Sequence, residues 1–96
     1  MFRNYTQDKP LGYQQIAGLV AATALTVPAG AVICIITPES QAVRWRDDGV
    51  APTATVGYPL SVGAELECTT QNMAGIQFIQ QAATATLNIT YYGAPL

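Results

Sequence analysis

Short apolar or alternating segments, separated by turn residues, run along most of this chain. Residues 31–37 are apolar and largely β-branched, and Gly30 and Pro38 bound them, which predicts a strand buried on both faces. Apolar and polar residues alternate in five further segments, which we predict to be strands: 40–46, 53–57, 64–69, 76–80 and 85–91. Residues 13–25 fit both a helical stripe and a strand, and we favour a strand at their end.

Turn residues punctuate these segments at residues 27–31, 47–49 and 61–63. Proline presets φ, glycine tolerates positive φ, and the side chain of Asp bonds nearby backbone. Strands separated by turns about every 8 to 12 residues are typical of antiparallel sandwiches and barrels. We therefore predict an all-β fold, either a small antiparallel β-sandwich or a jelly-roll-like barrel. Residues 1–12 have little periodicity and predict an extended N-terminal arm, and residues 13–96 a single β-sandwich domain.

The uncharged segment 11–38 has the length of a membrane span or a signal sequence. Pro28 and Gly30 interrupt it and threonines dilute it, so no run of about 20 continuous apolar residues remains. Asp8 also stands where a signal peptide carries a basic leader. We therefore expect a protein that is made in the cytoplasm and has no membrane partner.

The amino-acid composition argues against several classes of function. Charged residues make up 10% of the chain, against a usual share of about 25%, so we expect a neutral surface that suits contact with another protein. A net charge of -2 with four basic residues argues against a nucleic-acid partner. The chain has no histidine, so neither a serine triad nor a Cys-His pair is available, and two cysteines are too few for a zinc site. We expect no enzyme activity, no cofactor and no metal.

Cys34 and Cys68 both fall in segments predicted as strands. Reduced cysteines behave as small hydrophobic residues, so two buried free thiols are the favoured interpretation. A disulfide between the strands is the alternative, which would need an oxidising compartment.

Four of the charged side chains and the only tryptophan occupy five consecutive positions, Arg44, Trp45, Arg46, Asp47 and Asp48. The favoured interpretation is a structural clasp, in which Arg44 or Arg46 pairs with a turn Asp across the mouth of a hairpin and Trp45 packs inward. The second is an intermolecular contact, because Trp and Arg are enriched in interface hot spots. Acid/base or cation chemistry is the weakest interpretation, since a calcium site needs about six oxygen ligands and more than two carboxylates.

Tyr91 and Tyr92 stand near the end of the last predicted strand. Neighbouring side chains in a strand point to opposite faces, so one ring should face inward and the other outward. Both are candidate interface residues, since an outward tyrosine is common at interfaces.

Several of these segments carry a resemblance to known proteins. They are residues 25–31 (LTVPAGA), 43–49 (VRWRDDG) and 52–60 (PTATVGYPL), followed by 63–66, 76–79 and 85–92. In this order they resemble short virion-associated proteins of tailed phages and prophages, which are small β-sandwich structural proteins. The resemblance covers residues 20–92 and leaves the first nineteen residues outside it.

The resemblance implies a capsid decoration (cement) protein of the virion, which binds and stabilises the head lattice. Its partners would be the phage major capsid protein or other virion proteins, and it would form a homo-oligomer, a dimer or trimer, after synthesis in the host cytoplasm. A neck, tail or fibre adaptor is the first alternative and would differ in copy number. A small carbohydrate- or ligand-binding β module is the second, and its aromatic platform would come from Trp45, Tyr58, Tyr91 and Tyr92. An enzyme is the least supported class, because no base, nucleophile or metal set has suitable spacing.

Overall fold

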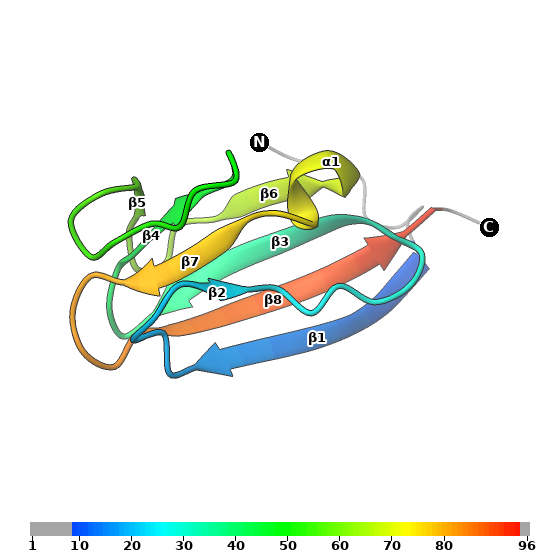
Figure 1. Cartoon of the computed structure of the whole chain (residues 1–96). Helices are drawn as coiled ribbons and strands as arrows, with labels where there is room; N and C mark the ends of the chain where they lie inside the picture. The colour runs from blue at the N-terminus through cyan, green and yellow to red at the C-terminus, as the bar shows by residue number, and fades with distance from the viewer. Residues whose placement is uncertain (1–8, 95–96) are drawn as a thin grey trace.

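Two four-stranded antiparallel sheets make up the computed structural model, which describes residues 9–94 (Figure 1). The first, called the long sheet below, contains in spatial order β1 (Lys9–Ala17), β8 (Thr86–Gly93), β3 (Ala31–Glu39) and β6 (Leu66–Thr69). The second, called the short sheet, contains β2 (Thr23–Ala24), β7 (Gln77–Gln80), β4 (Val43–Arg46) and β5 (Tyr58–Leu60).

The strand order is that of a jelly roll. Strands of the first half of the chain pair with strands of the second half in reverse order: β1 with β8, β2 with β7, β3 with β6 and β4 with β5. These pairs alternate between the two sheets, and the β3–β8 and β4–β7 pairings complete each sheet. One long antiparallel ribbon has thus been rolled into two layers, which is the jelly-roll arrangement. The predicted all-β antiparallel sandwich with jelly-roll character is confirmed.

The core lies between the two sheets, and the strands alternate between facing it and facing away. In β3 the side chains of Cys34 and Ile36 are fully buried, whereas Ile35 and Thr37 are half-buried on the outer face. Burying one large apolar side chain contributes roughly 1.5–3 kcal/mol, so this cluster is the main source of stability. Its buried members come from both sheets and their connections: Leu19, Ala31, Cys34, Ile36, Val43, Leu60, Cys68, Met73, Ile76, Phe78, Ala85, Leu87, Ile89 and Tyr91.

Most of the predicted strands are present with slightly different bounds. The strands predicted at 31–37, 40–46, 64–69, 76–80 and 85–91 correspond to β3, β4, β6, β7 and β8. The strand favoured at the end of residues 13–25 is β2, and the beginning of that segment is also a strand, within β1. The predicted turn before β3 is confirmed, since Ala31 N–H donates to the carbonyl of Pro28 at 3.2 Å and Gly30 has a φ of 85°.

The boundary of the predicted N-terminal arm, residues 1–12, must be corrected, because β1 already begins at Lys9. Residues 1–8 lie outside the described residues. Lys9 lies opposite Gly93 and Pro10 opposite Tyr92, and the register shifts before Gly12. Proline and glycine are depleted in regular strands and occur at edges and bulges, so the sequence pattern does not predict this edge strand.

The strand predicted at residues 53–57 is wrong. The N–H of Thr53 donates to the carbonyl of Val56 at 2.8 Å, and Val56 N–H donates to the Thr53 hydroxyl at 2.9 Å. Short polar side chains that bond nearby backbone groups favour turns over strands. The segment belongs to the loop 47–57, and β5 begins only at Tyr58.

A single helical turn, α1 (Thr70–Met73), connects β6 to β7. The side chain of Asn72 accepts a hydrogen bond from Thr69 N–H at 3.0 Å, which satisfies a backbone donor at the start of the turn. Within residues 9–94 no helix is long and apolar enough to span a membrane.

Candidate interaction site

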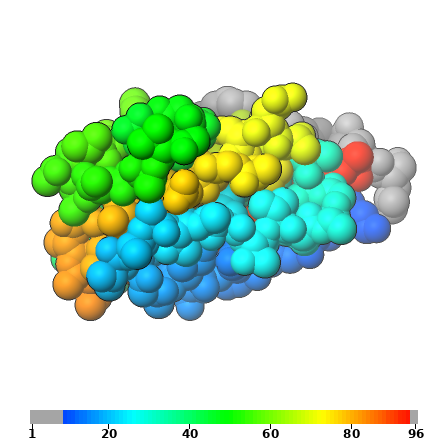
Figure 2. Space-filling view, in the orientation of Figure 1, coloured from blue at the N-terminus to red at the C-terminus, as the bar shows by residue number. Residues whose placement is uncertain are grey.

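The charged segment, residues 44–48, begins on β4 and continues into the loop that leads to β5. Val43 is fully buried and Trp45 packs against the core, so Arg44 and Arg46 project from the outer face of the short sheet. In Figure 2 the loop is the green region, which extends from one end of the molecule towards the yellow atoms of α1. The fold thus places both arginines on an outer surface and Trp45 on the opposite side of the strand.

Arg44 binds the loop 47–57 rather than a carboxylate. Its Nη1 donates to the carbonyl oxygen of Gly57 at 2.8 Å, and its Nε donates to that of Ala54 at 3.3 Å. Gly57 has a φ of 146°, and a Cβ added there would lie 3.1 Å from the Cβ atoms of both Arg44 and Pro52. Close approach and backbone conformation therefore both require glycine. We call the two hydrogen bonds the Arg44 clasp, since they hold the loop against β4.

Arg46 makes the predicted ion pair with a turn aspartate, Asp48. Nε of Arg46 donates to Oδ1 at 3.0 Å and Nη2 donates to Oδ2 at 2.6 Å, in a bidentate geometry. These hydrogen bonds hold the pKa of the Asp48 carboxyl below its ordinary value and raise the pKa of Arg46. The pair joins residues two positions apart, not the two sides of a hairpin, and it is exposed. The predicted clasp between an arginine and a turn Asp across the hairpin mouth is therefore corrected. The contact across the hairpin is made by Arg44, which binds the carbonyl groups of Ala54 and Gly57.

Asp47 lies apart from this ion pair. Its Oδ2 accepts a hydrogen bond from Asn72 Nδ2 of α1 at 3.3 Å. The two neighbouring carboxylates thus have separate partners, which leaves no shared carboxylate site. Among residues 9–94, no group of three or more His, Cys, Asp or Glu side chains is arranged to hold a metal ion.

Trp45 packs inward, as predicted. Its ring stacks against that of Tyr58 with centroids 5.2 Å apart and planes tilted by 36°. Its Nε1 is buried and has no hydrogen-bond partner among the described residues. Tyr58 is 66% exposed, so it covers the outer end of Trp45 and is itself open to contact.

The two candidate interface tyrosines differ in exposure. Tyr91 is 2% exposed and belongs to the core cluster, so it is corrected from an interface residue to a core residue. Tyr92 is half-buried on the outer face of the long sheet. The predicted alternation of one ring inward and one outward is confirmed.

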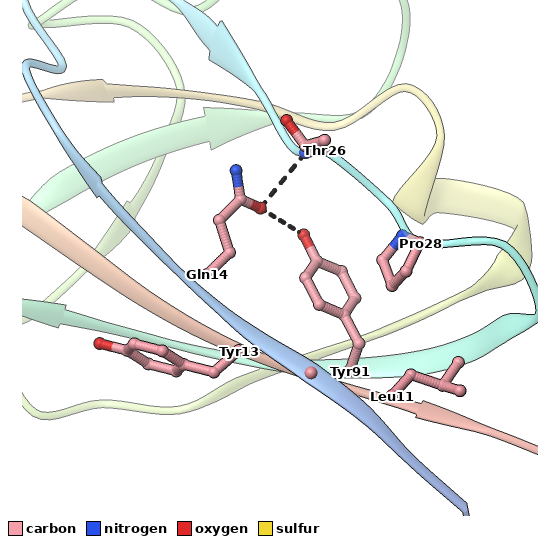
Figure 3. A pocket seen from close by; sticks show the side chains of 7 residues that line it. Leu11, Tyr13, Gln14, Thr26, Pro28 and Tyr91 are labelled. Atoms are coloured by element: carbon pink, nitrogen blue, oxygen red, sulfur yellow. Dashed lines mark hydrogen bonds between the residues drawn. The ribbon is translucent and has the colours of Figure 1, made fainter.

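Gln14 of β1 supports the Tyr91 ring from the side of the sandwich (Figure 3). Its Oε1 accepts hydrogen bonds from the Tyr91 hydroxyl at 2.6 Å and from Thr26 N–H at 3.2 Å. Burial raises the pKa of Tyr91 to about 12. These groups line an open pocket of about 340 Å³, together with Leu11, Gly12, Tyr13 and Pro28. Through its hydrogen bond with Thr26, Gln14 connects β1 to the segment between β2 and β3.

The outer face of the long sheet carries a second polar cluster, which sequence reasoning missed. Asn88 is its centre: Oδ1 accepts hydrogen bonds from the Tyr13 hydroxyl and from Gln15 Nε2, the latter at 3.1 Å, and Nδ2 donates to Glu39 Oε1 at 2.9 Å. The cluster connects β1, β8 and β3. Alternation in residues 85–91 already placed Asn88 outward, but its partners could not be found without recognising β1.

A shallow hollow lies beside this cluster on the same face. It has a volume of about 340 Å³ and is lined by Tyr13, Ile35, Thr37, Glu65, Asn88, Ile89, Thr90 and Tyr92. The β3–β6 register places Glu67 opposite the outward Ile35, so the carboxylates of Glu39, Glu65 and Glu67 share this face. We define the docking face as Tyr13, Gln15, Thr37, Asn88 and Thr90, the uncharged polar residues at its centre.

Comparison with protein families, with curated protein sequences and with solved structures found no match to this chain. The likeness to phage virion proteins is therefore carried by the sequence segments alone, and the family stays a prediction.

Proposed function

We propose that this protein is a non-enzymatic structural protein of a phage virion, specifically a decoration protein that binds the major capsid protein on the head lattice. The observation that carries the proposal is the docking face. Its centre is uncharged and the carboxylates of Glu39, Glu65 and Glu67 lie around it, so contact at the centre itself requires no desolvation of charge. The hydrogen bonds around Asn88 already fix Tyr13 and Gln15, so little side-chain entropy is lost on binding.

The jelly roll agrees with this proposal. The architecture recurs in viral capsid domains and also in lectins, and a fold by itself does not define a function. The segments 25–31, 43–49 and 52–60, which resemble phage virion proteins, favour the virion over a carbohydrate-binding role.

A homo-oligomer is part of the proposal, with β1 as the contact. β1 is an edge strand of nine residues, whereas the other edge strands, β6, β5 and β2, have four, three and two. Lys9, Pro10 and the register shift before Gly12 protect the start of β1 against pairing, whereas residues 13–17 carry no charge and no proline. Antiparallel pairing of this uncharged part of two β1 strands would give a two-fold dimer.

Substitution of Gln15 by Lys tests the dimer, since it places like charges close together on two paired β1 strands. We expect Gln15→Lys to convert a dimer into a monomer in light scattering after gel filtration. Gln71→Lys, on the exposed side of α1, adds the same charge away from β1 and should leave the dimer intact. A monomeric parent protein, or a Gln15→Lys variant that remains dimeric, would rule out this contact.

The protein composition and the imaged density of purified phage particles test the virion role directly. A decoration protein should be present at high copy number, with jelly-roll density over the outer surface of the head. A low-copy ring at the neck or tail would replace the decoration role with that of an adaptor. Absence from the mature particle would overturn the proposal altogether.

Binding of the purified protein to undecorated heads tests the docking face. Thr90 pairs with both Tyr13 and Ile35 at the centre of this face. Thr90→Arg places a long charged side chain at this centre, and we expect affinity to fall by roughly tenfold or more. Gln71→Arg on α1 is the matched control and should bind as the parent protein does. Equal binding of both variants would show that another surface makes the contact, and binding to glycans instead of heads would favour the lectin alternative.

A further inference from the structure

The two cysteines are directly opposite one another in the long sheet. The register of β3 and β6 pairs Cys34 with Cys68, and both side chains are free, fully buried and part of the core cluster. Directly opposed residues of an antiparallel pair have Cα atoms about 4.5 to 5.5 Å apart. A disulfide spans Cα separations of roughly 4.4 to 6.8 Å. The strands therefore already hold the two cysteines at a distance that a disulfide can join, with no change of register.

The two thiols also interact with each other. The hydrogen bond with Cys68, together with burial, raises the pKa of the Cys34 thiol. The same hydrogen bond lowers the pKa of Cys68. The hydrogen bond between the two thiols stabilises a thiolate within the pair, and a thiolate is the species that attacks a disulfide.

The position of β6 explains how a reagent would reach this buried pair. Within residues 9–94, β6 has four residues, pairs only with β3 and forms an edge of the long sheet. β3, by contrast, is held on both sides, by β6 and by β8. Short edge strands open locally without unfolding the whole domain. Opening of β6 would expose Cys68 first and leave Cys34 in place.

We propose that Cys34 and Cys68 form a thiol–disulfide exchange site, which closes an intramolecular disulfide between β3 and β6 when it meets a low-molecular-weight disulfide. The Cys68 thiolate attacks one sulfur of the small disulfide, forming a mixed disulfide and releasing one small thiolate, which takes up a proton. Cys34 then gives up its proton and attacks the Sγ of Cys68, releasing the second small thiol. The two protein thiols lose two electrons, and the small disulfide gains them. This inference is independent of the virion role.

The new bond would fasten β6, the shorter edge strand of the long sheet, to β3. It closes a loop between positions 34 and 68, and cross-linking of such a loop restricts the unfolded chain. We expect the midpoint of thermal unfolding to rise by on the order of 10 °C.

Oxidised glutathione is the probe for the experiment. The folded full-length protein is incubated with it, remaining thiols are blocked by alkylation, and intact mass and cysteine-containing peptides are measured with time. We expect loss of two hydrogens per chain, a Cys34–Cys68 peptide, and a rate faster than that of global unfolding measured under the same conditions. Cys34→Ala should stop at a glutathione adduct on Cys68, and Cys68→Ala should leave Cys34 reduced.

Several results would overturn the proposal. They are thiols of the parent protein that stay reduced, thiols that react only as fast as the chain unfolds, a stable glutathione adduct in the parent, and disulfides between two chains. The parent protein alone decides among these outcomes, so the proposal stays testable even where an alanine variant does not fold.

Discussion

The long sheet and the short sheet enclose one core but are stabilised differently. Three strands of the long sheet have eight or nine residues, whereas no strand of the short sheet has more than four. The long sheet is held mainly by continuous backbone pairing. The short sheet relies on individual side chains, among them the Arg44 clasp and the Trp45–Tyr58 stack. In this fold, specific side chains replace backbone pairing where strands are short.

Substitution of Leu87 by Ala should have the largest effect, because it removes a fully buried side chain from the central part of the long sheet. We expect the free energy of unfolding to fall by about 2–5 kcal/mol in urea titrations. Thr86→Ala, on the outer face of the same strand, should change it by less than about 0.5 kcal/mol. Similar losses for the two variants would mean that burial does not distinguish the two faces of this sheet.

Arg44→Ala should have an intermediate effect that is local to the short sheet. Loss of hydrogen bonds from a partly buried guanidinium to two carbonyl groups should cost about 1–2 kcal/mol. Amide hydrogen exchange should accelerate in residues 50–57 and stay unchanged in β8. Asp48→Asn, which removes the exposed ion pair with Arg46, should destabilise less, since such pairs contribute little. Equal effects of the two variants would contradict the distinction between clasp and surface ion pair.

Tyr91→Phe should cost about 1 kcal/mol, because the hydroxyl donates a single hydrogen bond to Gln14. The clearer readout is alkaline pH. Burial raises the pKa of Tyr91 from 10.0 to about 12, so the neutral phenol is favoured in the folded state. Its contribution is complete below pH 10 and is lost as pH rises towards 12, because the unfolded chain ionises first. The free energy of unfolding should therefore fall less steeply between pH 10 and 12 for Tyr91→Phe than for the parent protein. If it falls equally steeply for both proteins, the raised pKa of Tyr91 is not the cause.

Most of the long sheet could be predicted from the sequence, because alternation is clear in strands whose outer face is polar and whose inner face is apolar. Leu87, Ile89 and Tyr91 alternate with Thr86, Asn88 and Thr90, and this places every side chain of β8 correctly. β1 was hidden because Pro10 and Gly12 interrupt the pattern of an edge strand.

The candidate site was less predictable, since its contacts join residues that are distant in the chain. The pairing of Arg46 with Asp48 is local and could be predicted. The binding of Arg44 to the carbonyl groups of Ala54 and Gly57 depends on the path of the loop, which no side-chain pattern encodes. Asn88 and Tyr13 are 75 positions apart and meet only because the jelly roll pairs its first strand with its last.

Trp45 gives this molecule a built-in optical reporter. It is the only tryptophan, and its ring lies between the core and the exposed Tyr58 ring on the hairpin of β4 and β5. Its fluorescence therefore comes from one defined place, and its emission wavelength depends on how well Tyr58 excludes water from it. Opening of the short sheet should shift this emission to longer wavelength before the long sheet unfolds. A single fluorescence titration, compared with circular dichroism, can thus follow the two layers of the sandwich separately.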